Sequence, residues 1–213
     1  MSPPRSPAPP PSPPLPSSPK ISPPPPPFAP PPILTIILNQ GWNWVSINVI
    51  PFDTSLNNLL PLSNNLSNDD IIKSSTQFSK YNSYKDSWEG PLTTWDPQQT
   101  HILKMKSAGY TFTVSGNPLT SVDVDSGWNW IAFASDQPKS SNMVYHTGGF
   151  SHNDILKSSN AFVIFRDGSF KGIQFQLQIG KGYLLYCQNN GTVTFSSQTH
   201  TNIRNTPSHT TNP

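Results

Sequence analysis

The chain contains one cysteine and one glutamate, and both scarcities restrict the chemistry available to it. A lone Cys187 has no partner for an intrachain disulfide and cannot build a cysteine-based zinc site. Because Cys187 follows the apolar run 183–186, we expect its thiol to be buried. With Glu89 as the only glutamate, a pair of catalytic carboxylates of the kind glycosidases use would have to consist of aspartates.

Long apolar stretches and blocks of like charge are also missing. The β-branched run 33–38 is far shorter than the roughly 20 residues of a membrane helix, so we expect no membrane insertion. No apolar segment follows Met1, so no signal peptide is expected. The net charge is +2, from 13 basic and 11 acidic residues without a basic block, and nucleic-acid binding is therefore not predicted.

Motifs for catalysis, metals and phosphate are likewise absent. No Gly-x-Ser-x-Gly sequence occurs, and glycines 180 and 182 lack the spacing of a phosphate-binding loop. His146, His152 and Asp154 are close in sequence, but they lack a known ligand spacing and have no histidine counterparts earlier in the chain. The sequence therefore predicts no catalytic residues, no metal and no cofactor.

What the chain does contain is an internal duplication. Gly-Trp-Asn-Trp occurs at 41–44 and again at 127–130. A second motif follows in the same order, as Asp-Ile-Ile-Lys-Ser-Ser at 70–75 and as Asp-Ile-Leu-Lys-Ser-Ser at 154–159. Two matched motifs in one order indicate a duplicated structural unit. Residues kept in both copies then serve the shared fold, and residues present in one copy are candidates for a private function.

Composition divides the chain into four parts. Residues 1–32 hold 18 of the 26 prolines and predict a disordered arm of polyproline II. The two copies are assigned to 33–117 and 118–197. Residues 198–213 are polar, with almost no apolar side chains, and predict a disordered tail.

Each copy consists of short segments that are rich in aromatic or β-branched residues and separated by turn formers. This pattern predicts a mostly β chain with two tandem copies of a small antiparallel β-sandwich or barrel-like unit; the alternative is one sheet system shared by both copies. One short helix is expected in the first copy, with the segment 53–55 (Asp-Thr-Ser) as its N-cap and Pro61 limiting it.

The tryptophans fall into two groups. Trp88 and Trp95 align with Phe170 and Leu177 of the second copy. Their positions therefore require a large apolar side chain and not an indole in particular, and we predict that both tryptophans pack in the core. The other four are repeated as tryptophan. Tryptophans spaced by two in an apolar strand are usually core, and we expect the strand 42–50 to be covered on both faces.

The alternative is a stacking surface for sugar rings, helped by tyrosines. The candidate ligand-binding residues are Trp42, Trp44, Trp128, Trp130, Tyr81 and Tyr183. Four repeated polar residues have a structural interpretation. Asn43 and Asn129 are expected to bond neighbouring backbone, and Asp70 and Asp154 to cap backbone N–H groups beside a turn.

The repeated motifs, with Trp-Glu-Gly-Pro-Leu at 88–92 and Gly-Lys-Gly-Tyr at 180–183, resemble a tandem module of surface-type proteins of algae, other microbes and large viruses that infect algae. The first copy departs from the last motif, with Gln-Gln-Thr-His at 98–101. The proline runs resemble extensin-like and pherophorin-like cell-wall glycoproteins. The resemblance implies no catalytic residues.

Together these features predict a non-enzymatic binding or adhesion module on a proline-rich stalk, at an extracellular surface or on a virion. Its expected partner is a polysaccharide or a surface protein. Two alternatives remain open: a structural assembly protein that associates with itself, and an accessory domain of a hydrolase. If the chain is secreted, Asn65 and Asn190 are glycosylation acceptors.

Overall fold

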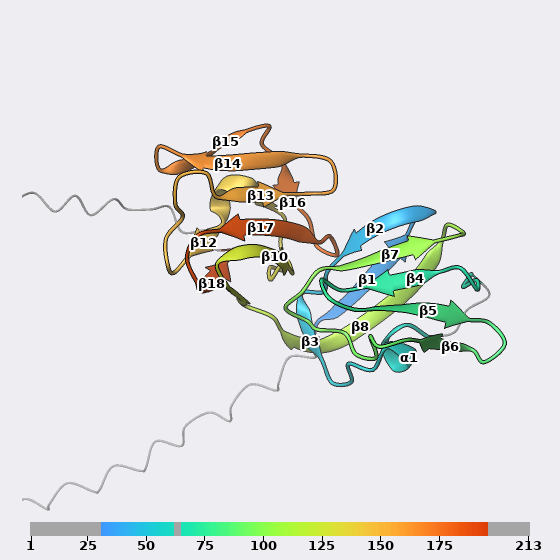
Figure 1. Ribbon diagram of the computed structural model, residues 1–213. Helices are drawn as coiled ribbons and strands as arrows, with labels where there is room; N and C mark the ends of the chain where they lie inside the picture. Colours follow the sequence, from blue (N-terminus) through green and yellow to red (C-terminus); the bar gives the residue numbers. More distant parts are fainter. Residues whose placement is uncertain (1–30, 62–64, 196–213) are drawn as a thin grey trace, which may run out of the picture. The chain divides into compact units, whose positions relative to one another are not determined.

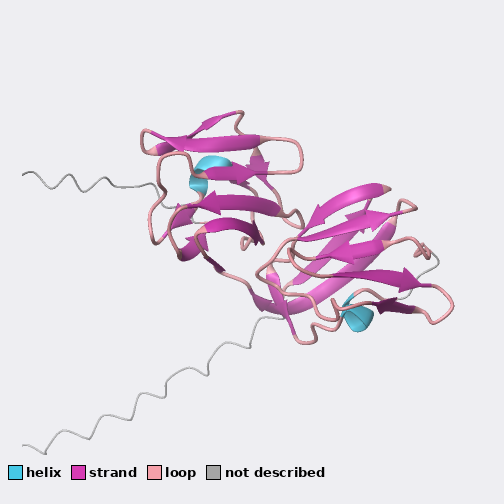
Figure 2. Cartoon of the chain, in the orientation of Figure 1, coloured by secondary structure: helices cyan, strands magenta, loops and turns pink. Residues whose placement is uncertain are grey.

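The computed structural model describes residues 31–61 and 65–195. They form short antiparallel strands and one short α-helix (Figure 2), which confirms the prediction of a mostly β chain. The predicted arm, apart from 31–32, and the whole predicted tail lie outside the described residues. Within the described part, no helix is both long enough and apolar enough to cross a membrane.

The first half builds a five-stranded sheet in the order β2-β7-β4-β5-β6 and a three-stranded sheet in the order β1-β8-β3 (Figure 1). All of these strand pairs are antiparallel. The elements are β1 (Ile33–Leu38), β2 (Gly41–Val45), β3 (Val49–Pro51), α1 (Leu56–Leu59), β4 (Ile71–Lys73), β5 (Phe78–Asn82), β6 (Ser87–Glu89), β7 (His101–Met105) and β8 (Tyr110–Pro118).

The second half builds a five-stranded sheet in the order β10-β17-β13-β14-β15, a three-stranded sheet in the order β12-β18-β9 and the pair β11-β16. The elements are β9 (Val122–Val124), β10 (Gly127–Ile131), β11 (Lys139–Ser140), the 3₁₀ turn η1 (Ser141–Met143), β12 (Tyr145–His146), β13 (Ile155–Lys157), β14 (Phe162–Arg166), β15 (Ser169–Gly172), β16 (Gln176–Leu177), β17 (Tyr183–Cys187) and β18 (Gly191–Thr194).

The two halves share one topology. In chain order, the strands of the two five-stranded sheets correspond one to one, and so do those of the three-stranded sheets. The pair β11-β16 has its counterpart in a single bridge between Ser55 and Thr94. The sheets are arranged like the four blades of a propeller, in two similar halves. The sequence predicted the duplication but did not anticipate this arrangement.

Each half has a hydrophobic core of its own. One cluster of buried side chains runs from Leu34 to Val114, and the other from Leu119 to Phe195. Ile179, which is partly buried, packs against both clusters. Trp88 and Trp95 are buried in the first cluster, which confirms that they serve packing. Cys187 is a fully buried free thiol, as expected, and burial raises its pKa to about 11.

The single strand predicted from Trp42 to Ile50 was wrong. β2 ends at Val45 and pairs with β7, whereas β3 begins at Val49 and pairs with β8 in a different sheet. Between them, the Ser46 hydroxyl donates to the carbonyl of Lys181 at 2.6 Å. The Asn48 side-chain amide also donates to the second half, at the carbonyl of Ser135, so polar groups of this connection bond the second half instead of continuing the strand.

Helix α1 confirms the short helix in the first copy, and its N-cap lies within the predicted segment 53–55. The N-cap residue is Ser55, which makes no side-chain capping bond. The Asp53 carboxylate instead accepts from the Ser55 N–H at 2.8 Å and from the Asn58 side-chain amide at 2.6 Å. These two hydrogen bonds lower the pKa of Asp53. Asp53 therefore fixes the turn ahead of the helix.

Candidate functional site

Each five-stranded sheet has one buried face and one open face. Along β2, Asn43 and Val45 are buried, whereas Trp42 on the opposite side is 58 % exposed. Trp128, at the same position of β10, is 55 % exposed. The expectation that this strand is covered on both faces was therefore wrong. The alternation of side chains along the strand assigned its residues to the two faces correctly. The face that carries the tryptophans also carries lysines, and it remains exposed to solvent.

The strand register places side chains of the open face in rows across the sheet. In the first half, one row reads Trp42, Lys104, Ile71, Lys80 and Glu89. The equivalent row of the second half reads Trp128, Tyr186, Ile155, Ile164 and Lys171. The two halves therefore keep the tryptophan but differ in charge beside it.

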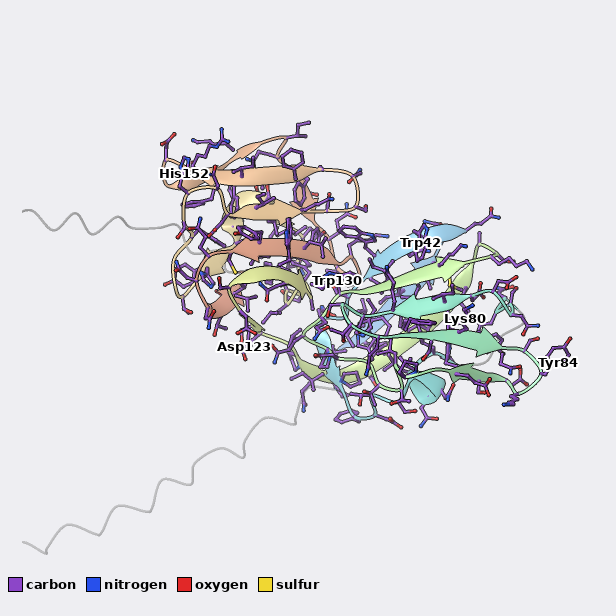
Figure 3. The ribbon with its side chains drawn as sticks, viewed as in Figure 1. Trp42, Lys80, Tyr84, Asp123, Trp130 and His152 are labelled. Atoms are coloured by element: carbon purple, nitrogen blue, oxygen red, sulfur yellow. The ribbon has the colours of Figure 1, made fainter. Side chains whose placement is uncertain are left out.

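Lysines lie against the indole rings of the open face. The Lys73 ammonium is 5.7 Å from the ring centre of Trp42 and 5.8 Å from that of Trp130 (both tryptophans are labelled in Figure 3). Lys104 is 5.8 Å from the Trp42 ring. Such cation–π contacts are worth about 0.5–1 kcal/mol at exposed sites. Lys73 thus joins an indole of the first half to an indole of the second.

The second half replaces this lysine contact by an aromatic one. Tyr186 occupies the position equivalent to Lys104, and its ring lies 5.5 Å from that of Trp128 at an angle of 57°. Further along the same face, Phe162 is 55 % exposed, as Phe78 is in the first half at 50 %. Large aromatic side chains therefore remain accessible on both open faces.

A polar pocket of about 340 Å³ lies beside Trp44. It combines aromatic groups with uncharged hydrogen-bonding groups and one lysine. Its lining is Trp44, Ser158, Ser159, Asn160, Phe175, Gln176, Gln178, Lys181, Gly182 and Tyr183. Of the described residues that line it, only Trp44 belongs to the first half, so the pocket forms where the two halves meet. Sequence reasoning missed it because nothing local connects these segments.

Tyr81 and Tyr183 do not belong to the open faces, and their prediction as stacking residues has to be corrected. Tyr81 is 4 % exposed, and its hydroxyl donates to Asp86 at 2.9 Å. Tyr183 is 2 % exposed, and its hydroxyl accepts from the backbone N–H of Gln178 at 2.6 Å. Burial raises the pKa of Tyr183 to about 12. Both side chains point to the core side of their strands, although Tyr183 also borders the polar pocket.

Asn65 and Asn190 are both exposed at the surface. The side-chain amide of Asn65 donates to the carbonyl of Gly109 at 3.2 Å. The side-chain oxygen of Asn190 accepts from the backbone N–H of Ser126 at 2.7 Å. Exposure is compatible with glycosylation of both residues, which stays a prediction.

Asp70 and Asp154 are fully buried and bond only backbone in the described part of the chain. Asp70 accepts from the N–H groups of Ser67 at 2.7 Å and Lys106 at 2.6 Å. Asp154 accepts in the same way from Ser151 at 2.7 Å and from Gln188 at 3.1 Å. Each carboxylate pins the turn before its strand, which supports the structural interpretation.

The repeated asparagines also bond neighbouring backbone, as expected. The Asn43 amide donates to the carbonyls of Asn39 and Gly41, and its oxygen accepts from the Asn39 N–H. Asn129 makes the equivalent three bonds in the second half. These bonds shape the turn that presents each exposed tryptophan.

The histidines of residues 65–195 do not gather into a set of metal ligands. His146 is 2 % exposed, and its Nδ1 lies 3.0 Å from the carbonyl of Gly149, while His152 is exposed. Within residues 31–61 and 65–195, no three His, Cys, Asp or Glu side chains are grouped as metal ligands would be.

Comparison of the chain with protein-family models, curated proteins and solved structures gave no significant match. The resemblance to surface modules of algae, microbes and algal viruses therefore stays a prediction.

Proposed function

We propose that this chain is a non-enzymatic carbohydrate-binding module that acts through the open faces of its two five-stranded sheets. The observation that carries this proposal is the exposure of Trp42 and Trp128, at 58 % and 55 %, at equivalent positions of the two halves. An exposed indole costs solvation free energy, and this exposure is repeated in both halves. Flat aromatic rings match the apolar faces of sugar rings.

The polar pocket supports the same ligand class. Sugar hydroxyls need hydrogen-bond donors and acceptors, and the pocket supplies serine, asparagine and glutamine side chains next to Trp44. A site with few charges and several aromatic groups suits a neutral hydroxylated ligand. The proposed setting is a cell or virion surface, with residues 1–32 as a spacer.

The proposal also includes the architecture of each half. Each half, with a hydrophobic core of its own, is a sandwich or barrel-like unit that presents one tryptophan face. Two equivalent faces on one chain would bind two stretches of one polysaccharide, which raises its apparent affinity without new contacts.

The test is a glycan array probed with the full chain and with Trp42→Ala and Trp128→Ala. We expect each variant to bind its best glycan about tenfold more weakly, which corresponds to ~1.4 kcal/mol. Tyr84→Ala is the matched control, because Tyr84 is 92 % exposed and lies in the turn between β5 and β6. Circular dichroism checks folding. Unchanged binding by both folded tryptophan variants would refute the proposal.

Self-assembly is the second candidate, favoured by Phe78 and Phe162, which are exposed at equivalent positions. Apolar side chains on an open sheet can pair with a second copy. Analytical ultracentrifugation distinguishes the two functions. Self-assembly would be favoured if the unmodified chain formed concentration-dependent oligomers and bound no glycan. The double variant Phe78→Ser with Phe162→Ser should then be monomeric.

A further inference from the structure

The open face of the first half carries a concentration of positive charge that the second half lacks. A hollow of about 440 Å³ is lined by Asp69, Ile71, Lys80, Lys104 and Lys106. We name it the basic hollow. Three ammonium groups against one carboxylate leave it with a net positive charge. It lies beside Trp42, because Lys104 both lines it and contacts the Trp42 ring.

The charge of the basic hollow is only partly compensated. Lys106 pairs with Asp69 at 3.6 Å, and both side chains are well exposed, so the pair is weak. Lys80 and Lys104 have no ion pair with another side chain of the described residues. Glu89 lies opposite Lys80, but its carboxylate accepts from Lys85 at 2.6 Å and from Asn82 at 2.8 Å. Two ammonium groups in the hollow are therefore left without a carboxylate, and one of them, that of Lys104, lies beside the exposed Trp42 indole.

The internal duplication shows that this charge is private to the first half. The positions of Lys80 and Lys104 hold Ile164 and Tyr186 in the second half. The lysine shared by both copies, Lys73 and Lys157, lies in the neighbouring row. The fold therefore does not require Lys80 and Lys104, since the same sheet forms with an isoleucine and a tyrosine in their places.

We infer that the basic hollow binds the sulfate or carboxylate group of an acidic polysaccharide whose sugar ring stacks on Trp42. This inference rests on the proposed function and assigns its ligand class. The Lys104 ammonium, already within contact of the indole, lies where an acidic substituent of a stacked ring would reach. The second half, with Tyr186 beside Trp128, takes an uncharged part of the same chain.

A single-stranded nucleic acid fits these faces less well. Such ligands need a basic groove that continues along several aromatic platforms. Here the row of the second half is aromatic and aliphatic up to Lys171 at its far end. The basic charge therefore suits a local acidic group rather than a continuous phosphate backbone.

The test is calorimetric titration of the full chain with matched polysaccharides. Dextran sulfate is compared with dextran, and polygalacturonate with its fully methyl-esterified form, at low and high salt. We expect the charged member of at least one pair to bind at least tenfold more tightly, and this advantage to shrink as salt rises because the contact is electrostatic. A single-stranded oligothymidylate is the competing probe.

The variants locate the effect. Lys80→Gln, Lys104→Gln and Lys106→Gln together should abolish the preference for the charged form. The control variant, Lys139→Gln with Lys157→Gln and Arg166→Gln, removes the same formal charge from the second half and should keep the preference for the charged form. An equal loss in the control would overturn the inference, because general charge would then explain the binding.

The remaining outcomes separate this inference from the proposed function. Equal binding of charged and neutral forms, lost in Trp42→Ala, overturns the acidic ligand but keeps carbohydrate binding. No binding to any polysaccharide overturns both. Tighter binding of oligothymidylate than of every polysaccharide would assign the hollow to nucleic acid instead.

Discussion

His101 is a titratable side chain buried in the first half. It is fully buried at the start of β7, and its ring centre lies 4.2 Å from that of Trp95. Neither of its ring nitrogens makes a hydrogen bond of good geometry among the described residues, and the backbone of Gln99 only partly offsets the loss of solvation. Loss of solvation disfavours the charged ring and lowers its pKa from 6.5 to about 4. His101 therefore stays neutral in the folded chain where an unfolded histidine would take up a proton.

This difference predicts a pH dependence of stability with a definite sign. Between pH 6.5 and about 4 the unfolded chain binds the proton and the folded chain does not, so the free energy of unfolding falls as the pH falls. Above pH 6.5 burial of the neutral His101 ring costs no stability through protonation. By pH 4 the free energy of unfolding has fallen by about 3 kcal/mol. Urea unfolding at several pH values measures it. His101→Phe should remove this part of the slope.

The matched control is His152→Ala, because His152 is exposed. It should leave the slope as in the unmodified chain. Identical slopes for His101→Phe and the unmodified chain would contradict the prediction.

The turns before β4 and β13 depend on one carboxylate each. Asp70 and Asp154 hold two backbone N–H groups from separate segments, in the loop before the strand and at the end of the neighbouring β7 or β17. A carboxylate accepts on both oxygens, whereas an amide has one acceptor and presents N–H groups to the other donor. The repeated aspartate is therefore explained by turn geometry.

Asp70→Asn and Asp154→Asn should each lower the free energy of unfolding by about 2 kcal/mol, because a buried N–H group loses its charged acceptor. Chemical denaturation at pH 7 measures the loss. Asp167→Asn is the control, since Asp167 is exposed in a turn with φ of 50°, where asparagine is well tolerated. Losses no larger than in the control would disprove this role.

The two halves are joined by buried hydroxyl groups. Thr100 Oγ1 donates to the carbonyl of Ile131 at 2.6 Å and accepts from the N–H of Tyr183 at 2.8 Å. Ser46 Oγ donates to Lys181 and accepts from the N–H of Phe133 at 3.1 Å. Because these groups are buried, leaving their partners without bonds costs free energy. The halves should therefore unfold together although each has its own core.

Thr100→Val with Ser46→Ala should uncouple the halves. Scanning calorimetry should give one cooperative transition for the unmodified chain, with equal calorimetric and van't Hoff enthalpies. For the double variant we expect a Tm lower by about 5 °C and a broadened or split transition. The control is Thr113→Val with Ser75→Ala, which changes exposed hydroxyls. A single sharp transition in the double variant would refute the coupling.

The duplication, the β class, the short helix and the packing of Trp88 and Trp95 follow from the amino-acid sequence alone. These features are encoded in repeated motifs and local alternation, which need no knowledge of distant contacts. Alternation also separated Trp42 from Val45 correctly. It did not reveal which of the two faces would be covered, because cover is supplied by segments far away in the chain.

The composition of the site, in contrast, depends on contacts that form only in the folded chain. β7 inserts between β2 and β4, and this strand order brings Lys104 to Trp42 and forms the basic hollow. Trp44 meets Gln178 in the polar pocket only where the halves join. Strand order and the packing of the two halves are set by the burial of both hydrophobic cores as a whole. These contacts join residues that are distant in sequence, so no local sequence pattern predicts them.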